Sequence, residues 1–169
     1  MNYFKLSENQ NISVPKKANN PAILDTVHNY AYTVKWNYTF TDNDTVFSIG
    51  KAVPADLGDA EYVINVTEEG AYARGKDYKS AVKGFLSLLE MIFCFGRDDY
   101  RVDCGKTLDS AKISFRSVHI CLFPEYSLNT IRKVIRTCGM AKYSHVILET
   151  WGCLKLDALK ELSWPQGHS

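Results

Sequence analysis

Three side chains near the C-terminal end of the sequence follow closely on apolar segments: Glu125, Glu149 and Trp151. Glu125 comes after residues 114–123 and Glu149 ends residues 145–149, two segments typical of β-strands. If the strands are parallel, these side chains meet at the carboxyl edge of a sheet, where ligands bind in open α/β sheets and in barrels. Carboxylates accept hydrogen bonds and an indole offers a flat apolar face, so the set suits a pyranose ring, whose apolar face is rimmed by hydroxyls. An ion pair of Glu149 with a helix terminus, and a Trp151 packed under a loop, explain the same residues equally well.

The elements that must hold these residues are two strands and the helix between them. Residues 114–123 are apolar and rich in β-forming residues, and Pro124-Glu125 ends the segment. Ser127 suits the N-cap of a helix whose apolar residues recur on one face: Leu128, Ile131, Val134, Ile135 and Cys138. Residues 145–149 predict a second strand, buried on both sides except at its polar end. This order predicts a βαβ unit with parallel strands, and because one unit cannot bury its own sheet, the chain looks like the opening of a larger parallel α/β structure.

The preceding residues change pattern and predict an α+β layer. Short segments rich in β-branched and aromatic residues predict strands over residues 30–40, 46–49, 61–66, 71–74 and 100–102. Residues 12–14 predict a short edge strand, and residues 54–59 predict a loop. Apolar residues at helical spacing predict a helix over residues 77–95, in which Gly84 allows a close approach to the sheet. Residues 103–114 read as a polar connector, which divides a first domain, residues 1–112, from a second, residues 113–169.

The composition is that of an ordinary globular protein and gives no reason to expect a nucleic-acid or membrane partner. The formal net charge of the 169 residues is +1, and no apolar stretch approaches the roughly 18 residues that span a bilayer. The first residues lack the apolar core of a secretory signal, which predicts a cytoplasmic protein unless an upstream segment carries a signal. The five cysteines are odd in number and include no CxxC pair, so buried free thiols are favoured over a disulfide framework.

The familiar catalytic and metal-binding motifs are missing from the sequence. It contains no HExxH, no histidine pair four residues apart, no GxSxG, no Walker loop and no GxGxxG. We therefore expect no bound metal and no cofactor. His119 lies in the middle of a predicted strand, where a hydrogen-bonded core histidine is favoured over a metal ligand. The acidic pairs Glu68-Glu69 and Asp98-Asp99 fall in turns and are expected to be solvated.

Four short motifs occur in order along the sequence. Residues 60–64 read Ala-Glu-Tyr-Val-Ile, residues 75–85 hold a Gly75…Gly84-Phe85 pattern, residues 115–117 read Phe-Arg-Ser and residues 142–144 read Lys-Tyr-Ser. In type and order these motifs resemble glycoside hydrolase family 20, the β-N-acetylhexosaminidases. The resemblance implies an α+β accessory domain of zincin-like fold without a metal, built from an antiparallel or mixed sheet and one long helix. It then implies the first, partial βαβ unit of a (β/α)8 (TIM) barrel, a carbohydrate substrate and hydrolysis of O-glycosidic bonds.

The sequence departs from this family at positions that would bind or cut the substrate. Where the first barrel strand of the family continues to Asp-x-x-Arg, residues 121–124 read Cys-Leu-Phe-Pro, and residues 147–149 read Ile-Leu-Glu in place of His-x-His. The catalytic Asp-Glu pair of the family lies on a later strand, so no residue here is assigned to catalysis. We expect an N-terminal portion of a hexosaminidase-like glycoside hydrolase that is inactive alone and self-associates through its exposed sheet edge. The alternative is a non-catalytic module that binds carbohydrate or protein through its sheet and the Trp151 loop.

Overall fold

The computed structural model describes residues 2–6, 11–15, 37–40, 46–52, 54–93 and 100–167. The chain divides into two compact units, residues 1–112 and residues 113–169, named unit 1 and unit 2 below. Most of the strand predicted at residues 30–40 and the cysteine Cys94 lie outside the described residues. No helix among those described is long and apolar enough to cross a membrane.

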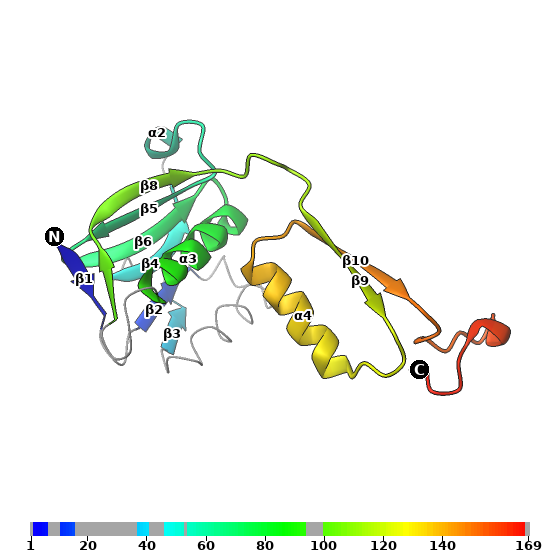
Figure 1. Cartoon of the computed structure of the whole chain (residues 1–169). Coiled ribbons are helices and arrows are strands. Elements are labelled where there is room, and N and C mark those ends of the chain that lie inside the picture. The colour runs from blue at the N-terminus through cyan, green and yellow to red at the C-terminus, as the bar shows by residue number, and fades with distance from the viewer. Residues whose placement is uncertain are drawn as a thin grey trace. The chain divides into compact units, whose positions relative to one another are not determined.

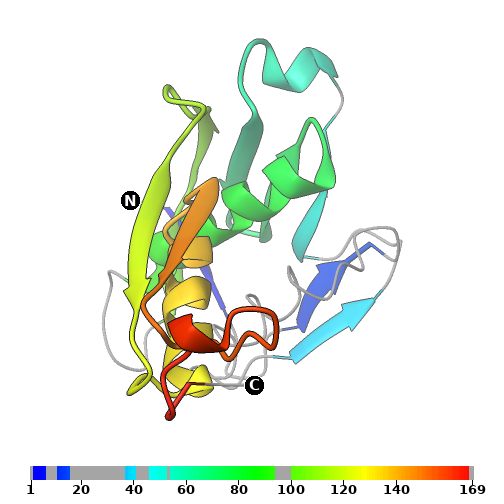
Figure 2. The ribbon, with the colours of Figure 1, turned by 90° about the vertical axis from the view of Figure 1, so that its right-hand side faces the viewer.

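Unit 1 contains a mixed six-stranded sheet in the order β3-β2-β4-β6-β5-β8 (Figure 1). Its strands are β2 (Asn11–Val14), β3 (Asn37–Phe40), β4 (Phe47–Lys51), β5 (Tyr62–Thr67), β6 (Gly70–Gly75) and β8 (Gly105–Asp109). β2 pairs in parallel with β3, as Figure 2 shows, and with β4, while β4 pairs in parallel with β6. The strands predicted at residues 61–66 and 71–74 are confirmed as β5 and β6, which form an antiparallel hairpin, and β5 also pairs antiparallel with β8. A separate antiparallel pair joins β1 (Tyr3–Lys5) to β7 (Arg101–Asp103).

The predicted long helix is confirmed as α3 (Tyr78–Phe93), which packs on one face of this sheet against β4, β5 and β6 (Figure 1). The helix begins where Asp77 Oδ1 accepts a hydrogen bond from the Ser80 amide at 2.7 Å, an N-terminal cap that also holds the pKa of Asp77 below its usual range. Apolar side chains at helical spacing meet the alternate side chains of the strands in one core. Its fully buried large residues are Ile12, Val14, Phe47, Ile64, Phe85, Leu88, Leu89, Ile92 and Val102.

The motif residues Glu61 and Tyr62 tie the hairpin to its neighbours. Glu61 Oε2 accepts a hydrogen bond from Lys83 Nζ at 2.9 Å, and this bond lowers the pKa of the Glu61 carboxyl. The Tyr62 hydroxyl donates to the carboxylate of Asp109 in β8 and lies 3.1 Å from the Ser87 hydroxyl in α3. Burial, together with the hydrogen bond to Asp109, raises the pKa of Tyr62 to about 12. Both residues therefore serve the packing of unit 1.

The close approach predicted at Gly84 is confirmed. A Cβ atom at this position would lie 2.8 Å from Cδ2 of the Tyr62 ring and 3.0 Å from its Cγ. Because Cβ atoms do not approach other heavy atoms so closely, only glycine lets α3 lie this near to β5. The glycine that weakens the helix by propensity is required by its packing on the sheet.

Three details of unit 1 differ from the sequence-based expectations. The polar connector contains a true strand, β8, whose five side chains are all exposed, so it lacks the apolar alternation that marks a half-buried strand. β2 lies between β3 and β4 rather than at the edge of the sheet. The loop expected at residues 54–59 begins with one helical turn, α2 (Pro54–Leu57), where a proline favours the first position of a helix.

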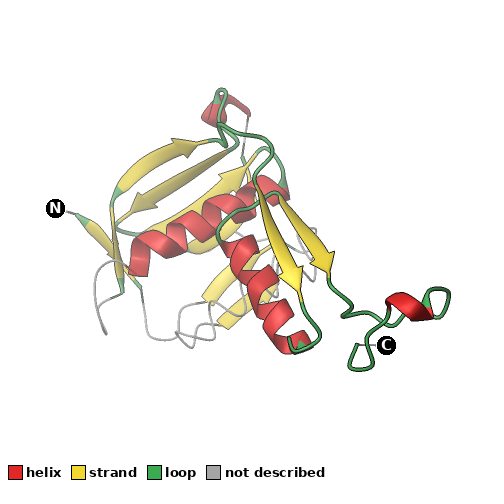
Figure 3. Ribbon diagram, turned by 45° about the vertical axis from the view of Figure 1, so that its right-hand side comes forward, coloured by secondary structure: helices red, strands yellow, loops and turns green. Residues whose placement is uncertain are grey.

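Unit 2 consists of β9 (Ser117–Leu122), α4 (Leu128–Met140) and β10 (His145–Thr150), followed by a short 3₁₀ turn, η2 (Lys160–Leu162). β9 and β10 pair in parallel with α4 on one face, as Figure 3 shows, so the strand–helix–strand order with parallel strands is confirmed. The predicted N-cap is also present, because Ser127 Oγ accepts a hydrogen bond from the Thr130 amide at 3.1 Å.

The burial predicted for both sides of the second strand is wrong in this chain. Ile147 is 47% exposed and Leu148 is 45% exposed, since β10 has a neighbouring strand on one side and a covering helix on one face. Other exposed apolar side chains of unit 2 include Ile113, Phe115, Leu128, Val134, Ile135 and Tyr143. Unit 2 by itself therefore presents an apolar surface of the kind that other protein or ligand normally covers.

Candidate functional site

The residues that follow β9 and β10 meet at the carboxyl edge of this two-stranded sheet. The register pairs Leu122 with Thr150 at the ends of the strands, and the Trp151 amide continues it by donating to the Leu122 carbonyl at 2.9 Å. This arrangement arises because a parallel pair brings both carboxyl ends to the same side. The edge is the part of the sheet that the sequence singled out as a ligand site.

An aromatic cluster occupies this edge: Phe123, Tyr126 and Trp151. The Phe123 and Trp151 rings are stacked, with centroids 6.4 Å apart and planes 19° apart, and Tyr126 meets Phe123 edge-on at 6.1 Å. All three are exposed, and Trp151 is 51% exposed, so the reading in which it is packed under a loop is wrong. Gly152 has a φ of +61°, and its missing Cβ leaves room for the Trp164 ring, which fixes the turn after Trp151. The cluster is thus an apolar aromatic surface open to solvent.

Glu149 lies one step back from this edge, within β10, and its partners are on β9. Its Oε2 atom lies 2.8 Å from His119 Nε2 and accepts a hydrogen bond from Cys121 Sγ at 3.4 Å. The hydrogen bond to this carboxylate, with smaller effects of desolvation and charge, raises the pKa of the Cys121 thiol. The three residues form the His119–Cys121–Glu149 cluster, and Glu149 does not pair with a helix terminus.

The sequence-based candidates thus separate into different positions. Trp151 and Glu149 come from the same strand end, but Glu149 is already engaged by the cluster on β9. Glu125 is exposed in the turn after β9, and none of the described contacts joins it to Glu149 or Trp151. His119 is exposed rather than in the core, which corrects the expectation of a core histidine. Phe123 and Cys121 were not proposed from the sequence as binding residues, although the His-x-Cys spacing places His119 and Cys121 on one face of a strand.

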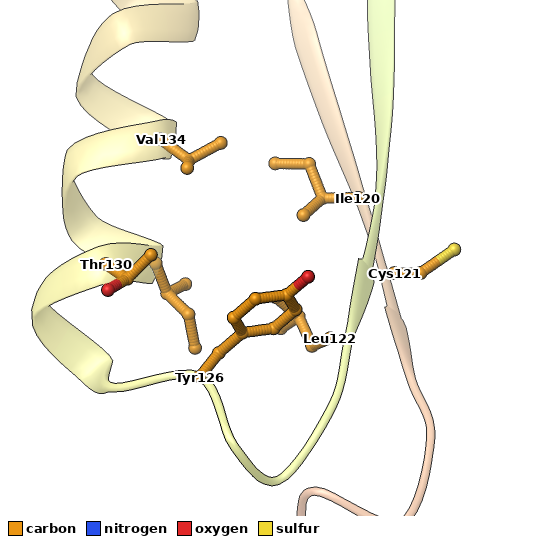
Figure 4. Close-up of a pocket in the computed structure, with 7 residues that line it drawn as sticks. Ile120, Cys121, Leu122, Tyr126, Thr130 and Val134 are labelled. Carbon is orange, nitrogen blue, oxygen red and sulfur yellow. The ribbon is translucent and has the colours of Figure 1, made fainter.

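A small pocket lies on the other side of the sheet, between β9 and α4 (Figure 4). It encloses about 160 Å³ and is lined mainly by apolar side chains, with hydroxyls only from Tyr126 and Thr130. Figure 4 shows Ile120 and Val134 facing one another across it, while the sulfur of Cys121 points away. A sugar needs several polar partners at once, so this pocket is a gap in the packing of α4 on the sheet rather than a sugar site.

The described cysteines are all free thiols, as the sequence predicts, but the burial predicted for them is wrong for Cys104 and Cys121. Cys138 and Cys153 are buried and behave as small apolar residues, whereas Cys121 is exposed on the sheet face opposite the pocket. Among these, Cys121 is the one with a carboxylate and an imidazole beside it.

No protein-family model matches the sequence, and no curated protein matches it either. Several solved structures match the fold. The GH20 exo-β-N-acetylglucosaminidase of Vibrio harveyi superposes with a TM-score of 0.74 at 15% identity, over 96% of this chain and 26% of that one. The GH20 β-N-acetylhexosaminidase of Streptomyces coelicolor A3(2) gives 0.68 at 13% identity, over 96% of this chain and 35% of that one. A family GH115 4-O-methyl-α-glucuronidase gives 0.67 at 9% identity, over 89% of this chain and 26% of that one.

These similarities are of fold, and the chain spans about a quarter to a third of the length of the enzymes it matches. The matched enzymes act on different sugars, so the shared part of their structures does not determine the substrate. The chain is a small α+β protein whose fold is that of a portion of the GH20 β-N-acetylhexosaminidases.

Proposed function

We propose that this chain is the N-terminal portion of a hexosaminidase-like glycoside hydrolase and that unit 2 contributes carbohydrate contacts. In this proposal residues 1–112 are the zincin-like accessory domain, and residues 113–169 are the first βαβ unit of a (β/α)8 barrel. The order of the sequence motifs and the fold similarity to GH20 enzymes support it. Trp151, with Phe123 beside it, is the stacking surface, and Glu149 and Glu125 are the hydrogen-bond acceptors.

The observation that carries this proposal is the exposed aromatic cluster at the carboxyl edge of two parallel strands. The Phe123 and Trp151 rings are stacked and both side chains are exposed, which presents apolar aromatic surface to solvent. Sugars stack on such surfaces through their C–H faces and are oriented by polar groups at the rim. In barrels, the same edge of the sheet holds the active site.

We also propose that this chain does not hydrolyse glycosides by itself. A barrel active site is built from the loops after several strands, and the described part of unit 2 supplies the ends of β9 and β10. The carboxyl groups assigned here as hydrogen-bond acceptors, Glu125 and Glu149, belong to side chains that solvent reaches. Without a wall that excludes water and holds the sugar, neither is placed to act as a general acid.

The second candidate is a non-catalytic module that binds carbohydrate or a protein partner. The same aromatic cluster favours it, since surface-exposed aromatic residues are frequent anchors of binding interfaces. The two candidates differ in what the chain needs in order to function. A portion of an enzyme needs further barrel strands, whereas a binding module binds its ligand without them.

The test measures binding and turnover on the purified chain. Isothermal titration calorimetry with N-acetylglucosamine oligomers is expected to show binding that Trp151→Ala weakens at least about tenfold, or about 1.4 kcal/mol. Tyr143→Ala removes another exposed aromatic residue from unit 2 and serves as the matched control, with unchanged affinity. Hydrolysis of an aryl β-N-acetylglucosaminide is expected to equal that of the Glu149→Gln variant.

The outcomes test the claim of inactivity and the role of the aromatic cluster separately. Turnover clearly above that of Glu149→Gln would show that a complete site lies within this chain and would overturn the claim of inactivity. Equal loss of binding in Trp151→Ala and Tyr143→Ala would remove the assigned role of the aromatic cluster. Binding of the isolated chain to N-acetylglucosamine oligomers, without turnover, supports the sugar contacts in either candidate, and binding to a protein partner alone supports the module.

We also expect the chain to self-associate through unit 2. Both β9 and β10 are edges of a two-stranded sheet, and several of their neighbours are exposed apolar side chains. Sedimentation velocity at increasing protein concentration is expected to show a shift from monomer to larger species. Replacing Ile147 with lysine, which puts a charge on this sheet, is expected to reduce that shift, and a chain that stays monomeric at all concentrations would contradict the expectation.

A further inference from the structure

The His119–Cys121–Glu149 cluster brings together three different metal-binding groups. His119 and Cys121 are two residues apart on β9 and therefore point to the same face of the sheet. Glu149 is the partner of Cys121 in the parallel register, which places its side chain on that same face. The imidazole, thiol and carboxylate ligand atoms all lie within 4.8 Å of one another.

The distances suit a tetrahedral ion after small side-chain movements. Zinc bonds of about 2.0–2.2 Å to nitrogen and oxygen and about 2.3 Å to sulfur place tetrahedral ligand atoms roughly 3.4–3.6 Å apart. Glu149 Oε2 is 3.4 Å from Cys121 Sγ and 2.8 Å from His119 Nε2, and Nε2 and Sγ lie within 4.8 Å of each other, so side-chain movements of about 1 Å bring the three atoms to this spacing. The His119 and Glu149 side chains are 53% and 40% exposed, which leaves them room to turn and leaves an ion free access.

The cluster does not have the arrangement of an activated nucleophile. In cysteine enzymes the imidazole lies beside the thiol and takes its proton, whereas here the carboxylate of Glu149 lies between them and pairs with both. A carboxylate next to a thiol disfavours the thiolate. A divalent cation reverses this effect, because it stabilises thiolate and carboxylate together.

We propose that His119, Cys121 and Glu149 bind one zinc-like divalent ion, with Nε2, Sγ and Oε2 as ligands and a fourth position open to water or a ligand. A thiolate and an imidazole favour zinc over magnesium or calcium, which take oxygen ligands. Three protein ligands with an open position are the pattern of zinc sites that bind a further molecule. The proposal replaces the expectation of no metal, which rested on the absence of histidine pairs at helical spacing.

The test uses the whole chain, stripped with a chelator, dialysed, and titrated with zinc in competition with a chromogenic chelator. One ion per chain is expected, and Cys121→Ser, His119→Ala and Glu149→Gln are each expected to weaken its binding at least about tenfold. Cobalt gives a second readout, since a thiolate ligand produces a sulfur-to-cobalt charge-transfer band that Cys121→Ser removes. Circular dichroism checks that each variant keeps its fold.

The matched control is Cys104→Ser, which changes a partly exposed cysteine of unit 1. It is expected to leave the zinc affinity and the cobalt band unchanged. Absence of stoichiometric zinc would overturn the proposal, and so would binding that survives all three cluster substitutions or is lost in Cys104→Ser. Trp151→Ala is expected to keep zinc while losing sugar affinity, so failure of the metal site and failure of the sugar site are distinguishable.

Discussion

Replacing Phe85 with alanine is expected to lower the free energy of unfolding by about 3–5 kcal/mol. Phe85 is fully buried in α3, and its ring centroid lies 5.2 Å from that of Phe47 in β4. Loss of the ring removes apolar contact and leaves a cavity between helix and sheet that the surrounding backbone closes only in part. Urea denaturation followed by far-ultraviolet circular dichroism measures the change.

Two further variants make this result specific to the packed face of α3. Leu89→Ala removes another buried side chain from the same helix and is expected to cost about 2–5 kcal/mol. Lys79→Ala changes an exposed position in the first turn of the helix and is expected to stay within about 0.5 kcal/mol of the parent. A loss below about 0.5 kcal/mol for both Phe85→Ala and Leu89→Ala would contradict the packing of α3 on the sheet.

Gly75→Ala is expected to destabilise unit 1 by about 3 kcal/mol or more. Gly75 ends β6, and the chain turns at once into α3. An added Cβ would lie 2.3 Å from the Ala81 amide nitrogen and 2.8 Å from the Asp77 carbonyl oxygen, both of them backbone atoms. Backbone atoms cannot rotate away as a side chain can, so the first turn of α3 must shift off the end of β6. Thermal and urea unfolding both report this loss.

Two other glycines give a graded comparison. At Gly105, in β8, no atom lies within 4 Å of an added Cβ, so Gly105→Ala is expected to change stability by less than about 0.5 kcal/mol. At Gly84 the Cβ meets the Tyr62 ring, which can move slightly but is held by its hydrogen bonds to Asp109 and Ser87. The expected order of destabilisation is Gly75→Ala, then Gly84→Ala, then Gly105→Ala. Equal effects at Gly75 and Gly105 would show that the turn into α3 is not as tight as described.

The core elements of unit 1 are predictable because the apolar residues of each recur with one clear period along the sequence. Apolar and polar residues alternate in β5 and β6 on either side of a two-residue turn, and apolar residues recur at helical spacing in α3. These elements can therefore be assigned without knowing what packs against them. β8 cannot be predicted in this way because it buries no side chain and so has no apolar alternation. It is a strand because it pairs with β5, which lies about forty residues away in the sequence. In unit 2, Ser127 and the spacing of α4 predict the helix, but the burial of β10 depends on neighbours that the spacing does not reveal.

The candidate site is only partly predictable for a related reason. Trp151 and Glu149 are visible as residues at a strand end. The contact of Glu149 with His119 and Cys121 requires the register of β9 against β10, which pairs Glu149 with Cys121 and is set by the intervening helix and its loops. A shift of one residue would send Glu149 to the α4 face and break the cluster. The spacing His-x-Cys predicts that His119 and Cys121 lie on the same face of β9. The structure adds that Glu149 is the residue beside Cys121 on the neighbouring strand.

The pairing of β1 with β7 has a consequence for the order in which unit 1 folds. Phe4 and Val102 are partners in this pair, and both are buried in the core that α3 covers. Almost all of unit 1 lies between them in sequence, so joining them closes a long loop, which slows folding. During synthesis Phe4 leaves the ribosome long before Val102 does. The first strand must therefore wait, with its apolar side chain uncovered, until residues 101–103 emerge, and this nascent intermediate is where unit 1 is most open to chaperones and to misfolding.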